Sequence, residues 1–441
     1  MQKLLIWKNK EDRKPLLLTG VRQCGKTYVC KEFGKKYFTD CAYFNFEGNN
    51  GLASIFEYDF NVDRIIDELG NIIRGKKICP GETLVIFDEI QECPRAITAL
   101  KYFCENMPQL HVVCAGSLLG VYIKRDNISF PVGKVDRLRM YPMSFSEFLK
   151  AGGNNSILEG TKKYDVEKEL PLLYTGKLEK ELKYYYIVGG MPEAVAKWIK
   201  THNFEEVEVI QENILQDYSN DFAKHAPISD IPKLGWIWDS IPKQLAKDNS
   251  KFVFSHVKEG KRSGELEDAL AWLIDAGLVH KLELVSHPEL PLSYCSDATY
   301  FKVYMSDVGL LRKKSGISYK TILEDSDLYK NFKGAFTENY VLTELLYQGI
   351  VPYFWRSGNT AELDFLFEFE DSIIPVEAKA QIHTRAKSFT QFCKKYKAKI
   401  GFKFSMKNVG ENRVEGVKVY SVPLYMIWRL EDYLKKINDN F

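Results

Sequence analysis

Short apolar runs alternate with amphipathic stretches through the first 150 residues of the chain. The apolar runs lie at residues 15–19, 41–46, 84–87 and 111–115. Continuous apolar runs of this length, separated by helical patterns, are typical of buried parallel strands joined by crossover helices. The pattern therefore predicts an α/β domain with a parallel sheet at the N-terminal end.

The pattern changes after the polar, glycine-rich break at residues 151–155. Helical periodicity continues to about residue 225, with one sharp interruption at 189–192. A further helix is expected over 234–246, and Ser263 caps a helical run that Gly277 ends. Two strands, 279–285 and 300–305, follow across a proline-containing loop, and helices followed by two strands suggest a winged helix.

The last 120 residues contain their own pair of strands and a helix. Residues 362–369 alternate acidic and apolar side chains, the period of a half-buried strand, and a second strand covers 373–379. A helix is expected over 335–347. We therefore predict an α/β multidomain protein with four parts: 1–155, a parallel-sheet domain; 156–225, a helical connector; 226–320, a winged-helix-like domain; and 321–441, a C-terminal α/β domain.

Composition narrows the class of protein. The net charge is +2, so any attraction to nucleic acid or an anionic membrane must come from a local patch. The nine cysteines form no CxxC pair, which favours free thiols in a reducing compartment. Four apolar residues near the N-terminus are too few for a signal peptide, and no run of eighteen apolar residues exists. We expect a cytoplasmic protein without membrane insertion.

Residues 20–27 fit the phosphate-binding pattern G-x-x-x-x-G-K-[ST], with an apolar strand before them and a helical stretch, 28–33, after them. The glycines let backbone N–H groups surround phosphates, Lys26 reaches the β- and γ-phosphates, and Thr27 ligates Mg²⁺. We therefore expect ATP and Mg²⁺ as cofactors. The residues expected to contact the nucleotide and its metal are Gly20, Arg22, Gln23, Gly25, Lys26, Thr27 and Asp88.

The strand at 84–87 ends in two carboxylates. Asp88 is expected to hold the Mg²⁺ shell, and Glu89 to polarise the attacking water. Without the phosphate-binding loop, an acidic strand end that only faces solvent would be the alternative. Ser117 follows the strand at 111–115 and could contact the γ-phosphate, since ligands bind beyond the carboxyl ends of such strands. An ordinary turn serine is the alternative there.

Five segments together resemble a group of prokaryotic AAA+ ATPases with a C-terminal domain named only as of unknown function: GVRQCGKT, IFDEIQ, CAGSLLG, YPMSFSEFL and GGMPEAV. The resemblance implies an AAA+ core, a winged-helix middle region and a nuclease-like C-terminal domain. Relatives usually carry Gly-Arg where this chain has Gly133-Lys134. Lys134 is a weaker bidentate partner for phosphate than arginine, so Arg137 or Arg139 is an alternative, in cis or in trans.

The strands at 362–369 and 373–379 bring three charged residues together in either of two registers. A two-residue loop at 370–371 pairs position i with 741 minus i and places Asp364 opposite Glu377. A loop at 371–372 places Asp364 opposite Lys379 instead. Two carboxylates that hold Mg²⁺ and a lysine that orients water are what a phosphodiesterase of the PD-(D/E)XK type needs. The set resembles the restriction-endonuclease-like fold, and Glu338 matches the additional glutamate of that fold.

Alternatives to a nuclease remain open for the C-terminal part. The strand pair could be a solvated hairpin whose charges form cross-strand pairs, or the domain could bind nucleic acid or a protein without cutting. Residues 394–403 hold five lysines, as a phosphate-binding surface would, whereas the expected recognition helix is acidic. Two functions follow: an ATPase coupled to a possible DNA-processing nuclease, or a signalling or scaffolding ATPase that binds a partner. The chain could also form a homo-oligomer.

Overall fold

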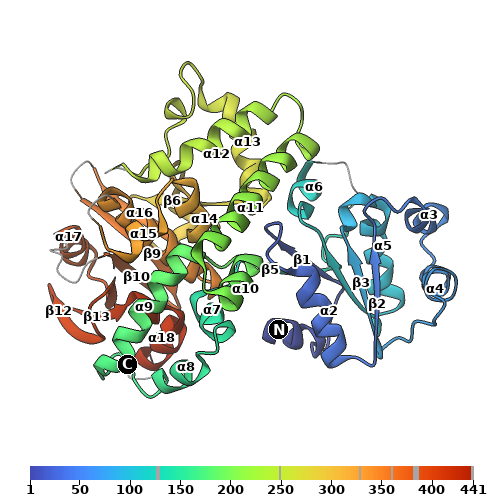
Figure 1. Cartoon of the computed structure of the whole chain (residues 1–441), viewed down its shortest axis with the longest axis horizontal. Coiled ribbons are helices and arrows are strands. Elements are labelled where there is room, and N and C mark those ends of the chain that lie inside the picture. Colours follow the sequence, from blue (N-terminus) through green and yellow to red (C-terminus); the bar gives the residue numbers. More distant parts are fainter. Residues whose placement is uncertain (126–129, 248–249, 327–328, 359–360, 381–386, 439–441) are drawn as a thin grey trace. The chain divides into compact units, whose positions relative to one another are not determined.

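The structure is a computed structural model that describes residues 1–125, 130–247, 250–326, 329–358, 361–380 and 387–438. The chain divides into two compact units (Figure 1). The first contains residues 1–141 and 275–278, and the second contains residues 142–274 and 279–441. Each unit is built on its own sheet. In the described ranges, no helix is both long enough and apolar enough to cross a membrane.

The first unit is an α/β fold around a five-stranded sheet in the order β2-β3-β4-β1-β5, in which every pairing is parallel. Its elements are α1 (Gln2–Lys8), β1 (Leu16–Gly20), α2 (Lys26–Tyr37), β2 (Asp40–Asn45), α3 (Asn50–Tyr58), α4 (Val62–Asp67), η1 (Glu68–Arg74), β3 (Thr83–Asp88), η2 (Ile90–Glu92), α5 (Pro94–Asn106), β4 (His111–Ala115), α6 (Leu119–Arg125) and β5 (Asp136–Met140). The parallel sheet is as predicted. The strand β5 was not predicted, because its sequence DRLRM is too polar to read as a buried strand.

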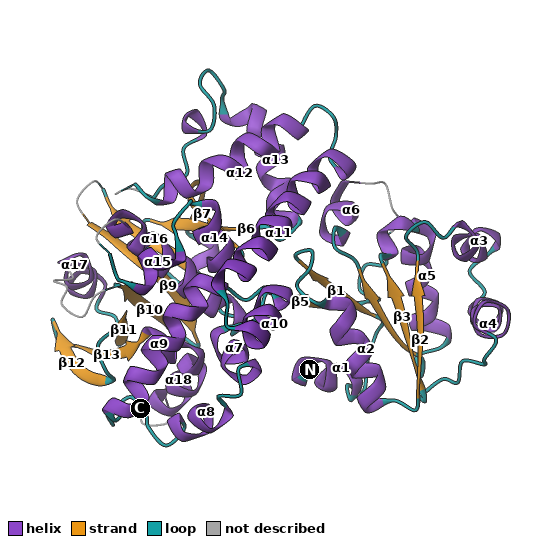
Figure 2. Cartoon of the chain, in the orientation of Figure 1, coloured by secondary structure: helices purple, strands orange, loops and turns teal. Residues whose placement is uncertain are grey.

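Both faces of this sheet are buried, which is why its strands are apolar at consecutive positions. On β3, Leu84 and Ile86 pack with α1 and α2, whereas Val85 and Phe87 pack with α3 and α5 on the other face. Figure 2 shows helices on either side of the sheet. The carboxyl ends of β1, β3 and β4 therefore meet at one edge, where the sequence places its candidate nucleotide-binding residues.

The second unit has an eight-stranded mixed sheet in the order β12-β13-β11-β10-β9-β8-β6-β7. Its helices are α7 (Phe145–Ala151), α8 (Asn155–Thr161), α9 (Leu172–Val188), α10 (Pro192–Thr201), α11 (Phe204–His225), α12 (Ile231–Leu245), η3 (Phe254–His256), α13 (Ser263–Asp275), η4 (Leu292–Tyr294), α14 (Val308–Lys314), α15 (Tyr319–Leu323), α16 (Lys330–Tyr347), α17 (Lys387–Tyr396), η6 (Leu424–Arg429) and α18 (Leu430–Asn438). Its strands are β6 (Val279–Val285), β7 (Ser296–Met305), β8 (Tyr353–Ser357), β9 (Ala361–Phe369), β10 (Ser372–Ala378), β11 (Ile400–Ser405), β12 (Gly410–Val414) and β13 (Val417–Pro423).

The hairpin of β6 and β7 is the edge of this sheet. We expected it to be the wing of a separate winged-helix domain, residues 226–320, but β6 pairs in parallel with β8, at Val285 and Trp355. Both residues are fully buried in a core that also contains Leu292 and Leu363. Backbone pairing and a shared core thus join the hairpin to the C-terminal strands, and the sheet continues across the expected boundary at residue 320.

The hairpin of β9 and β10 adopts the first of the two predicted registers. Phe369 pairs with Ser372, and each further pair also sums to 741, which leaves Glu370 and Asp371 as the loop. Glu370 has a φ of 50°, the left-handed backbone that such two-residue loops require. Continuing this register places Asp364 opposite Glu377.

Candidate functional site

The phosphate-binding loop joins β1 to α2 and has the backbone that its glycines allow. Gly20, Gln23 and Gly25 have φ values of 149°, 64° and 90°. A Cβ atom on Gly20 would lie 2.2 Å from the carbonyl oxygen of Met140, so no larger residue fits there without moving β5. Lys26 Nζ lies inside the loop and donates hydrogen bonds to the carbonyl oxygens of Gly20, at 2.8 Å, and Val21, at 2.9 Å.

The loop is connected directly to the acidic end of β3. Thr27 Oγ1 donates a hydrogen bond to Asp88 Oδ2 at 2.8 Å, and the hydroxyl of Tyr43 on β2 donates to the same oxygen at 2.8 Å. Asp88 is 4% exposed. A buried carboxylate therefore lies beside the threonine at the N-terminus of α2, and this is the oxygen pair that Mg²⁺ prefers. Tyr43 could not be identified from the sequence, because an isolated apolar strand does not reveal which side chain faces the site.

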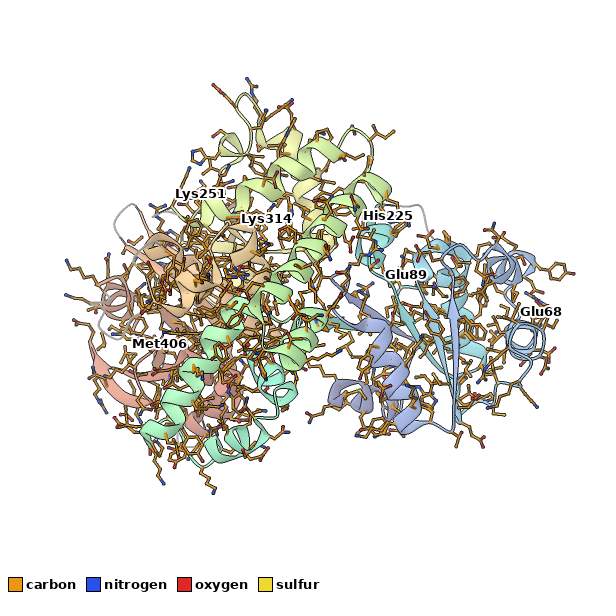
Figure 3. All side chains as sticks on the ribbon, in the orientation of Figure 1. Glu68, Glu89, His225, Lys251, Lys314 and Met406 are labelled. Atoms are coloured by element: carbon orange, nitrogen blue, oxygen red, sulfur yellow. The ribbon has the colours of Figure 1, made fainter. Side chains whose placement is uncertain are left out.

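Glu89, labelled in Figure 3, follows Asp88 with a φ of 49° and is held by three donors. Gln91 Nε2 lies 2.5 Å from Glu89 Oε2. The backbone N–H and the hydroxyl of Ser117 each donate to the same oxygen at 3.3 Å. Ser117 thus contacts Glu89 rather than lying in an unrelated turn, and Gln91 is a further member of the site that the motif IFDEIQ contained but the sequence analysis did not use.

The three basic residues of the 134–139 segment lie at different distances from the loop. Lys134 forms an ion pair with Glu105 at 2.9 Å, and the adjacent Asp136 pairs with Leu16, the first residue of β1. The loop begins at the other end of β1, roughly 13 Å away for a strand of this length. Lys134 is therefore paired with Glu105 near the end of β1 that lies away from the loop.

Arg139 is the best placed of the three. It pairs with Thr19, next to the loop, whereas Arg137 pairs with Leu17 and lies over the ring of Phe130. Burial raises the pKa of the Cys24 thiol inside the loop, and the charges of Lys26 and Arg139 oppose that rise. Arg139 is thus close enough to act on the loop electrostatically.

The second candidate site lies in the other unit, on β9 and β10. Lys379 Nζ contacts Asp364 Oδ2 at 3.1 Å and Glu377 Oε1 at 2.8 Å. Asp364 Oδ2 also accepts the backbone N–H of Ala378 at 2.8 Å. Both carboxylates are buried, and no residue that the structure describes forms a hydrogen bond with Glu377 Oε2. The three predicted residues are therefore brought together by the hairpin, as expected.

Glu338 on α16 lies on the other side of this cluster, where Lys302 of β7 pairs with it. The Lys302 ammonium is 1% exposed and lies 3.4 Å from Glu338 and 2.6 Å from Glu362. The hydroxyl of Tyr304 donates to Glu338 at 2.6 Å. Lys302 and Tyr304 come from the hairpin that the sequence analysis assigned to another domain, so their presence in the cluster was missed.

Burial and neighbouring charges set the protonation of the cluster. Burial, reinforced by the charge of Asp364, raises the pKa of Glu377 to about 7. Burial also raises the pKa of Asp364, although Lys379 and Lys302 oppose it. Burial alone would raise the pKa of Glu338, but Lys302 and Tyr304 outweigh it and hold that pKa below its usual value. The cluster is therefore a coupled set of acids balanced by two lysines.

The fit of the two sites to Mg²⁺ differs. At the loop, the hydroxyl of Thr27 and a carboxylate oxygen of Asp88 converge, and a site of this kind needs few protein ligands because Mg²⁺ keeps several waters. In the hairpin cluster, Glu377 Oε2, which no described residue hydrogen-bonds, suits a cation, but Lys379 already pairs with both carboxylates. In the part of the chain that the structure describes, no three His, Cys, Asp or Glu side chains converge as a metal-binding group.

Three family profiles match successive parts of the chain. Residues 12–149 match the AAA domain, residues 179–321 match a domain of unknown function (DUF8612), and residues 333–425 match another domain of unknown function (DUF4143). The first match and the loop geometry together support a P-loop ATPase of the AAA+ type in the N-terminal unit. The curated proteins contain no match to the chain.

Solved structures with similar folds are distant. The Walker-type ATPase paby2304 of Pyrococcus abyssi is 14% identical, with a TM-score of 0.42 over 68% of this chain and 91% of that one. The Aeropyrum pernix ORC2 protein in its ADPNP-ADP complexes is 14% identical, with a TM-score of 0.35 over 74% of this chain and 91% of that one. At these TM-scores neither likeness indicates a function.

Proposed function

We propose that the chain is a Mg²⁺-dependent ATPase of the AAA+ type whose C-terminal unit acts on the phosphate backbone of nucleic acid. The observation that carries the first part is the hydrogen bond of 2.8 Å between Thr27 Oγ1 and Asp88 Oδ2, beside the ammonium of Lys26. It joins the phosphate-binding loop to the carboxylate that the metal needs, and so supports a complete nucleotide site within one unit.

The proposed roles follow from these positions. The N–H groups of the loop, including those of Arg22 and Gln23, and the ammonium of Lys26 bind the phosphates. Thr27 and Asp88 hold Mg²⁺, which, when bound, neutralises charge on the β- and γ-phosphates. Glu89 orients the attacking water. Gln91 and Ser117 hold the Glu89 carboxylate in position, and Arg139 is the basic residue that acts on the loop in cis.

Two variants test the ATPase assignment. Lys26→Ala should lose nucleotide binding, because the loop then has no ammonium for the phosphates. Glu89→Gln should bind ATP normally but hydrolyse it at least about tenfold more slowly. Lys36→Ala, an exposed lysine on the same helix, is the matched control for Lys26. Hydrolysis at the wild-type rate by both Lys26→Ala and Glu89→Gln would mean that the site is assigned wrongly.

The nuclease part of the proposal rests on Asp364, Glu377 and Lys379. Glu377 Oε2, which has no hydrogen-bond partner among the described residues, and the adjacent Asp364 would hold a divalent cation. Lys379 would orient water or stabilise charge on the phosphate. Lys403 pairs with Glu377 across β10 and β11 and adds positive charge next to it. Residues 394–399 place four further lysines on the surface near the start of β11, which suits a polyanionic partner.

The alternative is that the C-terminal unit binds a protein or nucleic-acid partner without cutting it. The observation that favours it is that Lys379 and Lys302 already pair with Asp364, Glu377, Glu338 and Glu362, so each carboxylate of the cluster has a cationic partner among its own side chains. Ion pairing of this kind is enough to explain the buried charges structurally.

Cleavage and metal binding separate the two possibilities. The wild type should cut linear, plasmid and branched DNA in the presence of Mg²⁺ or Mn²⁺, and the variants Asp364→Ala and Lys379→Ala should not. Mn²⁺ binding, measured by calorimetry, should be lost in Asp364→Ala. If the wild type neither cuts DNA nor binds Mn²⁺ at this cluster, the binding function is favoured. Pull-downs with ATP, with ADP and with Glu89→Gln then test for a partner retained in one nucleotide state.

A further inference from the structure

A cavity of about 420 Å³ lies beside α9 and α16 in the second unit, outside the cluster of Asp364 and Glu377. Its volume falls in the range of small-molecule sites. Ala380 and Met406, which follow β10 and β11, close one side of it. These two strands are parallel, so the cavity lies beyond their carboxyl ends, the usual position for ligands in such sheets. We call this cavity the α9–α16 pocket; Figure 3 labels Met406.

The lining of the α9–α16 pocket combines flat apolar surface with charge. Tyr186 and Met406 are half-buried and line it. Phe336 and Tyr329 also line it, and their rings stack on each other at 6.5 Å between centroids. An aromatic ring and a flexible thioether suit a planar heterocycle. Leu182 completes the apolar floor. The pocket is therefore shaped for an aromatic ligand rather than for an extended chain of charges.

Two of its four charged side chains form no hydrogen bond or ion pair with a described residue, although the charge of Lys183 contributes to lowering the pKa of Asp325. Lys333 pairs with Asp325 at 2.7 Å. By contrast, Lys183 and Glu179, one turn apart on α9, form no ion pair or hydrogen bond with a described residue. Burial raises the pKa of Glu179, and the nearby charge of Lys183 opposes that rise. A cation and a carboxylate are thus both available to a ligand that carries an anionic group and N–H donors.

We propose that the α9–α16 pocket binds one nucleoside monophosphate unit, with the base against Tyr186 and Met406 and the phosphate on Lys183. Glu179 accepts hydrogen bonds from the exocyclic amino group of the base, as carboxylates do when they read nucleobases. Bases that carry an exocyclic amino group, adenine, cytosine and guanine, are therefore preferred over uracil. The nucleotide is either free or part of a single strand, since a base in a duplex is stacked and cannot enter.

The pocket adjoins the proposed nuclease cluster without sharing its side chains. Thr337 and Ala380 line the pocket, and their neighbours Glu338 and Lys379 belong to the cluster. The inference needs binding alone, so it holds whether or not the cluster cleaves nucleic acid. If both are correct, the unit acts on strands that contain an unpaired nucleotide.

The test uses the full chain with Lys26→Ala, which removes nucleotide binding at the loop. Calorimetry measures the binding of AMP, CMP, UMP, adenosine and inorganic phosphate. Fluorescence measures the binding of single-stranded and duplex oligonucleotides that contain 2-aminopurine. AMP and CMP should bind at least about fivefold more tightly than UMP. Adding Lys183→Ala should weaken AMP about tenfold and leave adenosine unchanged, whereas Lys180→Ala, an exposed lysine on the same helix, should change neither.

The remaining outcomes decide whether the bound nucleotide is free or part of a strand, and which base the pocket prefers. Quenching of 2-aminopurine in the single strand, lost in Lys183→Ala, identifies a nucleotide within a strand, whereas binding of AMP without such quenching identifies a free nucleotide. Glu179→Gln should reduce the preference for AMP over UMP. Binding should survive Asp364→Ala, which disables the proposed nuclease. Absence of binding by AMP, CMP and the single strand, or equal effects of Lys183→Ala and Lys180→Ala, overturns the proposal.

Discussion

Tyr43 shows how a residue without motif character becomes part of a site. Its hydroxyl donates to the Asp88 oxygen that also accepts from Thr27. Burial and the carboxylate of Asp88 raise the pKa of Tyr43 above its usual value, so the hydroxyl stays protonated and remains a donor. We infer that Tyr43 is a positioning residue for Asp88.

The variant Tyr43→Phe tests this role, because it removes one donor and leaves the ring in place. The expected result is an ATPase that needs roughly three- to tenfold more Mg²⁺ for half-maximal activity, with a smaller effect on nucleotide affinity. A titration of ATPase rate against Mg²⁺ measures this. Tyr58→Phe, whose ring is exposed, is the control; an unchanged Mg²⁺ requirement in Tyr43→Phe would remove the positioning role.

Glu344 is a buried acid that belongs to no motif in the sequence. It is 1% exposed, accepts the backbone N–H of Phe145 at 2.8 Å, and has a pKa that burial raises to about 8. A carboxyl whose pKa is raised on folding favours the folded state when protonated. Its contribution is therefore present below its unfolded pKa and is lost as the pH rises toward 8.

The variant Glu344→Gln should remove this pH dependence, since a neutral amide oxygen still accepts from Phe145. At pH 4 the two proteins should have similar stability. As the pH rises from 5 to 8 the variant should gain progressively in free energy of unfolding relative to the wild type, by about 4 kcal/mol at pH 8. Denaturant unfolding at several pH values measures the difference, and a constant difference across that range would show that Glu344 ionises normally.

Among the elements, the positions of strands with apolar sequences were predicted well. Which strands pair with one another across a sheet was predicted less well. The runs at 84–87 and 111–115 became β3 and β4, and the loop at 370–371 set the register of β9 and β10. Alternation along a strand fixes which side chains share a face, but it does not say which neighbour completes a sheet. For this reason β6 and β7 were assigned to a separate domain, and Lys302 was left out of the cluster around Glu338.

The hairpin of β12 and β13 turns through Glu415 and Gly416, whose φ values are 49° and 82°. Two positive φ values favour Asn-Gly, and glutamate is strained at the first position. Glu415→Asn should therefore raise the free energy of unfolding by about 0.5–1 kcal/mol. Glu415→Val places a β-branched residue at the same φ and should lower it; both are measured by thermal and denaturant unfolding. Destabilisation by both variants would contradict the argument.

At the scale of the whole molecule, the two units offer separate readouts of ligand binding. Of the seven tryptophans, Trp7 alone belongs to the first unit. ATP with Mg²⁺ at one hundred times its dissociation constant should stabilise that unit by about 2.7 kcal/mol. Hydrogen exchange should slow in β1, β3 and α2, with little change in β9 and β10. Equal protection of both sheets would show that the units respond together.

The continuity of the eight-stranded sheet limits where the chain can be divided into fragments or recombined with another protein. Profile matches end at residue 321 and begin again at 333, yet strands on both sides of that gap are neighbours in one sheet. A fragment that starts after residue 321 would expose the edge of β8 and leave Glu338 and Glu362 without Lys302. A protein that acquires this region by recombination should therefore acquire residues 279–423 together.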